Sequence, residues 1–142
     1  EVSELNGIEI VCISGVLKHA IAVSRDNRVF VIGENKDGQL GFGQKSTGVR
    51  KFTENLSLVG LNIVEAYAGS YHSLFKTVNG KIYACGYNVY GQLLLKSGPG
   101  NHVYDPTETL IENASFCIAG GGSSVIFRNY IPPMNPNKKM IC

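Results

Sequence analysis

Tryptophan is absent from the sequence, and charged residues are scarce: Asp, Glu, Lys and Arg together make up 17% of the 142 residues. Hydrophobic residues make up 44%, which is enough for a packed core and unlike the composition of a disordered chain. The net charge is +2, and adjacent basic residues occur only at Arg50-Lys51 and Lys138-Lys139. Because nucleic-acid-binding domains usually gather basic residues into a patch, we do not expect this segment alone to bind nucleic acid.

Long apolar runs are also absent, so we expect no membrane-spanning segment. The first residue is Glu1, and no charged-then-apolar leader follows it, which suggests a fragment, a processed chain or a deliberately bounded segment. No long stretch has the i, i+3, i+4 spacing of an amphipathic helix, and residues 55–61 are expected to hold a short turn at most. The expected class is therefore all-β.

Paired cysteines are missing as well. Cys12, Cys85, Cys117 and Cys142 form no C-x-x-C pair, which argues against a zinc site. We interpret them as free thiols in a reducing compartment, so the chain is expected to be intracellular, in either the cytoplasm or the nucleus.

The sequence repeats itself with a period near 50 residues. Residues 29–40 read VFVIGENKDGQL, and residues 82–93 read IYACGYNVYGQL, 53 residues later. The identical positions are Gly33 with Gly86, Asn35 with Asn88, Gly38 with Gly91, Gln39 with Gln92, and Leu40 with Leu93. A repeat of this length must be considered first, because it determines the architecture.

The repeat extends upstream, where His19 pairs with His72 at the same offset and Gly15 pairs with Gly69. A partial third copy begins near residue 118 and has Ser123 at the histidine position. Cys12, Ala66 and Cys117 share one column, two residues before a small residue and a glycine. That column predicts a tight packing position, so all three side chains should be almost fully buried and no disulfide should form.

Short apolar, β-branched runs separated by turn residues predict strands in each copy. They lie at 8–13, 20–23 and 29–32, and again at 63–67, 74–77 and 82–85. Asn79-Gly80, and Asp26-Asn27 in the first copy, predict tight hairpins in which both turn residues have positive φ. The predicted fold is an incomplete β-propeller of antiparallel four-stranded blades, with repeats at about 8–60, 61–111 and 112–128 within a 1–128 domain. Residues 129–142 contain three prolines and are expected to form a tail without a regular strand.

The pattern G-x-x-H, then N/D-G/N-x-V/I-Y/F-x-x-G-x-N-x-x-G-Q-L, resembles the repeat of the regulator of chromosome condensation family. Two copies match it, at 15–41 and 69–93, and a third matches only at its start. The sequence departs from the family at Ile32 and Cys85, where a Trp is usual, and at Leu94, which replaces the Gly after G-Q-L. The resemblance implies a propeller of seven four-stranded blades, of which this chain supplies fewer than three, so we expect the remaining blades to belong to a longer chain.

The resemblance implies two functions. The first is a scaffold for protein–protein interaction within a larger protein, and we rank it higher. The alternative is guanine-nucleotide exchange on a Ran-like small GTPase, with chromatin contact. No catalytic constellation is recognisable, so we expect neither an enzyme in this chain alone nor a cofactor or metal.

The candidate site residues fall into two groups. The turn after each G-x-N is expected to face a protein partner, through Asn35, Lys36, Asp37, Asn88 and Tyr90. The other recurring positions are interpreted as structural, and His19 and His72 are each expected to bond backbone within their own blade rather than to bind metal or act in catalysis. These structural positions are His19, His72, Gly33, Gly86, Gly38, Gly91, Gln39 and Gln92.

Overall fold

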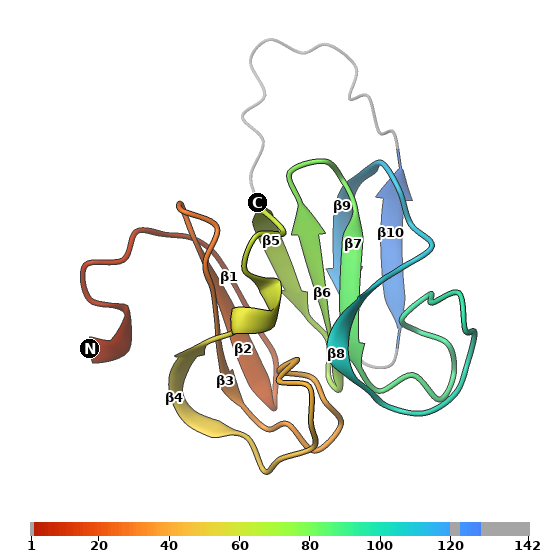
Figure 1. Ribbon diagram of the computed structural model, residues 1–142, viewed down its shortest axis with the longest axis horizontal. Coiled ribbons are helices and arrows are strands. Elements are labelled where there is room, and N and C mark those ends of the chain that lie inside the picture. The colour runs from red at the N-terminus through yellow and green to blue at the C-terminus, as the bar shows by residue number, and fades with distance from the viewer. Residues whose placement is uncertain (1, 120–122, 129–142) are drawn as a thin grey trace, which may run out of the picture.

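The computed structural model describes residues 2–119 and 123–128. Three antiparallel sheets follow one another along the chain (Figure 1). The first contains β1 (Ile10–Gly15), β2 (His19–Ser24), β3 (Val29–Gly33) and β4 (Val49–Glu54), and the second contains β5 (Ile63–Ala68), β6 (His72–Thr77), β7 (Ile82–Gly86) and β8 (Val103–Glu108). The third pairs β9 (Ala114–Ala119) with β10 (Ser124–Arg128), and two short 3-10 helices, η1 (Ser3–Leu5) and η2 (Leu56–Leu58), lie between strands or before them. The all-β prediction and the four-stranded blades are confirmed.

The two complete blades, blade 1 (β1–β4) and blade 2 (β5–β8), reproduce each other in register. His19 lies opposite Gly33 in blade 1, and His72 lies opposite Gly86 in blade 2. The register also shifts at equivalent places, once early in β1 and β5 and once between the third and fourth strands. The repeat therefore specifies the irregularities of the blade as well as its strands.

The hairpins between β2 and β3 and between β6 and β7 form as predicted, but their turns differ from the prediction. Only the last loop residue, Asn27 or Gly80, has a positive φ, at 64° and 79°. Asn27 N–H bonds to the carbonyl of Ser24, whose own N–H bonds to the carbonyl of Arg28. This is a three-residue loop, a type I turn closed by a left-handed residue, so one positive φ is sufficient.

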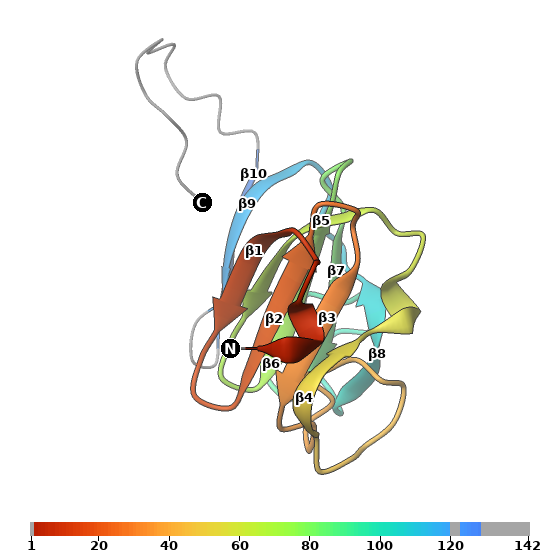
Figure 2. The ribbon, with the colours of Figure 1, turned by 90° about the vertical axis from the view of Figure 1, so that its left-hand side faces the viewer.

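The core lies between the blades rather than within one. One cluster joins apolar side chains of β2 and β3, such as Ile21 and Val31, to those of β5 and β6, such as Ile63 and Phe75. A second cluster joins the other face of blade 2 to the third sheet. The sheets stack face to face, as the two perpendicular views show (Figures 1 and 2).

The predicted cysteine column is only partly confirmed. Ala66 is buried, but Cys12 is only half-buried, although its Sγ lies 3.7 Å from the carbonyl oxygen of Ala66. Cys12 packs at the margin of the core between blades 1 and 2, whereas Ala66 lies on β5, which contacts both β1 and β9. Cys85 is a buried free thiol. The side chain of Cys117, and the predicted tail at 129–142, lie outside the described residues.

We predict that the uncovered face of β1 promotes self-association. Val11 and Ile13 are 44% and 66% exposed, and they alternate with Cys12 and Ser14, which point toward blade 2. Replacing both residues with threonine should reduce association of the isolated chain, because less apolar surface remains to be covered. The stability should change by less than about 1 kcal/mol, because exposed sites contribute little.

Light scattering after size exclusion would measure the association, and urea unfolding would measure the stability. The double substitution Leu56→Thr with Val59→Thr, at exposed positions away from β1, is the matched control. Equal association of the two double variants would contradict the prediction.

Candidate interaction surface

Each loop after the third strand of a blade is closed by a buried asparagine. Asn35 Oδ1 accepts the N–H of Leu40 at 3.0 Å, and its Nδ2 donates to the carbonyl of Gln44 and the hydroxyl of Ser46. Asn88 makes the equivalent bonds, accepting from Leu93 and donating to the carbonyl of Gly98. The two side chains are 0% and 2% exposed. The expectation that Asn35 and Asn88 face a partner is therefore wrong, because both amides are used inside the loop.

The recurring glutamines and glycines fix the same loops. Gln39 and Gln92 are buried, and their Oε1 atoms accept the N–H groups of Asp37 and Tyr90 at 3.0 and 3.1 Å. Gly33 has φ of 119°, and a Cβ there would lie 2.2 Å from the carbonyl oxygen of Lys18. No other residue fits at that position without moving the backbone.

The repeated histidines link neighbouring blades. His19 Nε2 lies 2.7 Å from Ser73 Oγ, and that hydroxyl donates to the carbonyl of Gln39 at 2.6 Å. Because the serine has one hydrogen and gives it to Gln39, it must accept from His19, which places the imidazole proton on Nε2. His72 makes the same link to Ser124 Oγ at 2.8 Å. The expected bonds to backbone of the same blade are wrong, because each ring reaches a serine of the next blade.

Burial keeps both rings neutral. Desolvation lowers the pKa of His19 to about 4, with a smaller contribution from His72, and desolvation alone lowers the pKa of His72 to about 4. Neither Nδ1 atom has a hydrogen-bond partner in the part of the chain that the structure describes. Protonation at Nδ1 would bury a charge whose added proton has no acceptor among the described residues, so burial favours the neutral rings.

We predict that stability is lost on acidification. The folded-state pKa values lie below the unfolded value of 6.5, so the unfolded chain binds more protons between these limits. Stability should be constant above pH 6.5 and fall between pH 6.5 and 4, by about 1 kcal/mol per pH unit for each ring. Urea unfolding at pH 7.5, 5.5 and 4.5 measures this change.

The double variant His19→Gln with His72→Gln provides the control, because it removes both titrating rings. Its unfolding free energy should depend less on pH in this window, even if it is lower overall. A wild-type free energy that stays flat or rises on acidification would refute the assignment.

Tyrosines gather on loops at the same end of the blades. Tyr71 precedes β6, and Tyr87 and Tyr90 follow β7; we call these three residues the tyrosine group. The Tyr87 ring centroid lies 6.2 Å from that of Tyr71 and 6.0 Å from that of Tyr90. His102, just before β8, meets the Tyr87 ring edge-on at 5.2 Å and donates from Nε2 to Asp37 Oδ1 at 2.9 Å. The loops of the two blades are thereby joined.

The sequence left part of this surface unpredicted. Of the expected partner-facing residues, Lys36 and Tyr90 are exposed and Asp37 is half-buried. Tyr71, Tyr87 and His102 were missed, because they do not belong to identical repeat columns. Ser73 and Ser124 were also missed, although a serine one residue after the histidine column in two copies could have indicated them.

Apolar side chains extend the tyrosine group. Leu17 and Tyr90 are 95% and 79% exposed, and Val16 and Val89 are also exposed. The loops β1–β2, β3–β4 and β7–β8 all lie at the lower end of the sheets in Figure 1. Single exposed apolar residues are ordinary, but a cluster of them on rigid loops is typical of an interaction surface.

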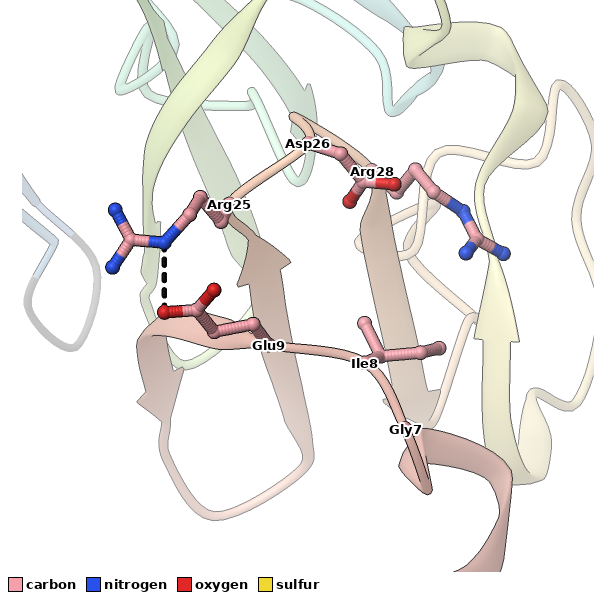
Figure 3. A pocket seen from close by; sticks show the side chains of 6 residues that line it. All are labelled: Gly7, Ile8, Glu9, Arg25, Asp26 and Arg28. Atoms are coloured by element: carbon pink, nitrogen blue, oxygen red, sulfur yellow. Dashed lines mark ion pairs between the residues drawn. The ribbon is translucent and has the colours of Figure 1, made fainter.

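The opposite end of blade 1 carries paired charges instead. A pocket of about 290 Å³ lies beside Gly7, Ile8 and the turn at 25–28 (Figure 3). Arg25 Nε bonds Glu9 Oε1 at 2.7 Å, and Arg28 forms a fork with both carboxylate oxygens of Glu54. The Arg25–Glu9 pair is solvent-exposed and contributes little to stability, whereas the Arg28–Glu54 pair is partly buried. Among residues 2–119 and 123–128, no group of three or more His, Cys, Asp or Glu could hold a metal ion.

The fold and the loops define tandem blades of a β-propeller whose loops form a surface rather than a catalytic cleft. No helix in the described part of the chain is long and apolar enough to cross a membrane. The family described as "Regulator of chromosome condensation (RCC1) repeat" matches residues 26–75 and again residues 63–92. The chain belongs to this repeat family.

Curated relatives carry different names. The chain is 35% identical over 117 residues to the secretion-regulating guanine nucleotide exchange factor of Bos taurus, a match covering 78% of this chain and 25% of that protein. It is also 35% identical over 105 residues to the human probable E3 ubiquitin-protein ligase HERC4, covering 72% of this chain and 10% of that protein. The chain thus spans a quarter or less of these relatives.

Solved structures support the fold. Prp20p from Saccharomyces cerevisiae superposes with a TM-score of 0.75 at 22% identity, covering 85% of this chain and 31% of that one. Human WBSCR16 superposes with a TM-score of 0.74 at 18% identity, covering 87% and 31%. At this level of identity the likeness concerns the fold alone.

Proposed function

We propose that this chain is a protein-interaction segment of a propeller within a longer protein. The observation that carries the proposal is the surface formed by the tyrosine group and the exposed residues Val16, Leu17 and Val89. Rigid loops limit the entropy lost on binding, because Asn35, Asn88 and the two glutamines already fix the backbone. Exposed tyrosines are typical hot-spot residues of interfaces.

The relatives favour the same proposal. A nucleotide exchange factor and a ubiquitin ligase both contain this repeat, although their named activities differ. A shared repeat therefore does not determine the activity, and presentation of loops is what it can contribute to both. We further propose that the missing blades come from the longer chain and that the protein resides in an intracellular, reducing compartment, given the buried free thiol of Cys85.

Nucleotide exchange is the second candidate, favoured by the match to the exchange factor. The structural relative Prp20p is described with binding properties toward Gsp1p and histones. In an exchange reaction the propeller would act by docking on a small GTPase and distorting its nucleotide site, so no catalytic side chain would be required. Fewer than three blades form only part of such a docking face.

We predict that partner contact depends on the loops β1–β2, β3–β4 and β7–β8, which lie at the lower end of the sheets in Figure 1. In a cross-linking experiment on the longer protein in cells, an amine-reactive reagent should join partner peptides to Lys18 and Lys36 more often than to Lys51 and Lys81. The double variant Tyr90→Ala with Leu17→Ala should reduce partner recovery about tenfold, which is typical for loss of one or two hot-spot residues.

Leu56→Ala with Val59→Ala is the matched control and should leave recovery unchanged. Equal loss from both double variants would remove these loops from the interaction. A nucleotide-release assay with a loaded Ran-like GTPase separates the two candidates: marked acceleration by the chain would promote the exchange function over the scaffold.

A further inference from the structure

A shallow depression lies where the loops of blades 1 and 2 meet. It measures about 340 Å³ and is lined by Asp37, Tyr71, Tyr87, Tyr90 and Gln92. Asp37 comes from blade 1 and the other four residues from blade 2. The depression therefore exists only when both blades are in place.

The tyrosine rings form walls rather than a stack. The Tyr71 and Tyr87 planes are inclined at 52°, and the Tyr87 and Tyr90 planes at 61°. Inclined rings do not cover one another's faces completely, as stacked rings would. Aromatic faces carry negative electrostatic potential, so such a space suits a cation.

A cation already rests on one of these rings. Lys18 Nζ lies 4.8 Å from the Tyr71 centroid, within the range of a cation–π contact, and it also pairs with Glu34 Oε2 at 3.4 Å. The ammonium is thus held against Tyr71 of blade 2 and Glu34 of its own blade. The contact shows that a Tyr71 face accepts positive charge in this setting.

The charge that lines the depression itself is negative. Asp37 uses Oδ1 to accept from His102, and no described residue donates to Oδ2. Its side chain is 22% exposed, so the carboxylate is fixed in position but open to a ligand. A carboxylate beside three tyrosines complements a guanidinium or an ammonium group and would repel an acidic segment or a phosphate.

We propose that this depression binds the arginine or lysine side chain of a partner protein. The cationic head lies against Asp37 and the rings of Tyr87 and Tyr90. The residues that flank it on the partner are apolar, because Val16, Leu17 and Val89 stand exposed on loops at the same end of the blades. This proposal rests on the proposed interaction function and specifies the chemistry of the partner.

The test uses the 142-residue chain, labelled with ¹⁵N, and short peptides. The probe is acetyl-Leu-Gly-Arg-Gly-Leu-amide, and the comparison peptides carry lysine, citrulline or glutamate in place of arginine. Citrulline has nearly the shape of arginine without its charge. The arginine and lysine peptides should shift the amide resonances of Asp37, Tyr87 and Tyr90 and bind more tightly than citrulline, with glutamate weakest. Raising the salt concentration should reduce this difference.

Substitutions in the depression test whether the peptide binds there. Asp37→Asn should remove most of the preference for arginine over citrulline, and Tyr87→Leu or Tyr90→Leu should weaken arginine binding about two- to fivefold each. Glu108→Gln is the matched control: this carboxylate also contacts a tyrosine and a basic residue, Tyr83 and Lys81, away from the depression. It should leave the titration unchanged, and the amide spectrum of every variant reports whether it has folded.

The proposal is overturned if arginine and citrulline peptides bind equally, if Asp37→Asn keeps the preference, or if the shifted resonances lie elsewhere. Such a result would leave the interaction function standing wherever cross-links to Lys18 and Lys36 persist. Loss of those cross-links together with normal arginine binding would instead refute the interaction function and keep the cation site. The two failures are therefore distinguishable.

Discussion

The structure depends on the need of each blade to cover two apolar faces. A four-stranded sheet with apolar residues on both sides cannot be stable alone in water, so each face must pack against another sheet. Blade 2 meets this condition, with one core cluster on each side. Blade 1 has the interblade core on one side, while Val11 and Ile13 stay exposed. The exposure of Val11 and Ile13 follows from this difference.

Hydrogen bonds between buried polar groups fix the loops and the position of each blade relative to the next. The asparagine and glutamine amides close each loop, and the histidines tie successive blades through serine hydroxyls. Buried polar groups of this kind are costly unless they are paired, so a shift of one blade would leave them unsatisfied. Side chains such as Lys36 and Tyr90 can therefore stand in solvent on loops whose backbone is already fixed.

The repeat made most of the fold predictable, because identical residues at a constant offset must occupy equivalent places. Gly33, Gly86 and both glutamines recur for this reason, and they fix the loops of the two blades in the same way. The repeat does not predict which partner a side chain bonds to. The Asn35 amide bonds within its own loop, and His19 bonds to a serine of the next blade. Tyr71, Tyr87 and His102 come together because two loops of blade 2 lie side by side, and Asp37 joins them from blade 1. No periodic pattern in the sequence predicts these contacts. The division into repeats at 8–60, 61–111 and 112–128 stays a prediction.

The histidine–serine links have a direction, and the residues at the two ends of the series limit how far it runs. The position that holds Ser73 in blade 2 and Ser124 in the third sheet holds Ala20 in blade 1, which offers no hydroxyl to an incoming imidazole. The third copy in turn has Ser123 where the histidine would stand. A ring built from this chain would thus contain two kinds of seam. Two inner junctions would carry the buried, pH-sensitive histidines, while the junctions that flank them would lack this histidine–serine link.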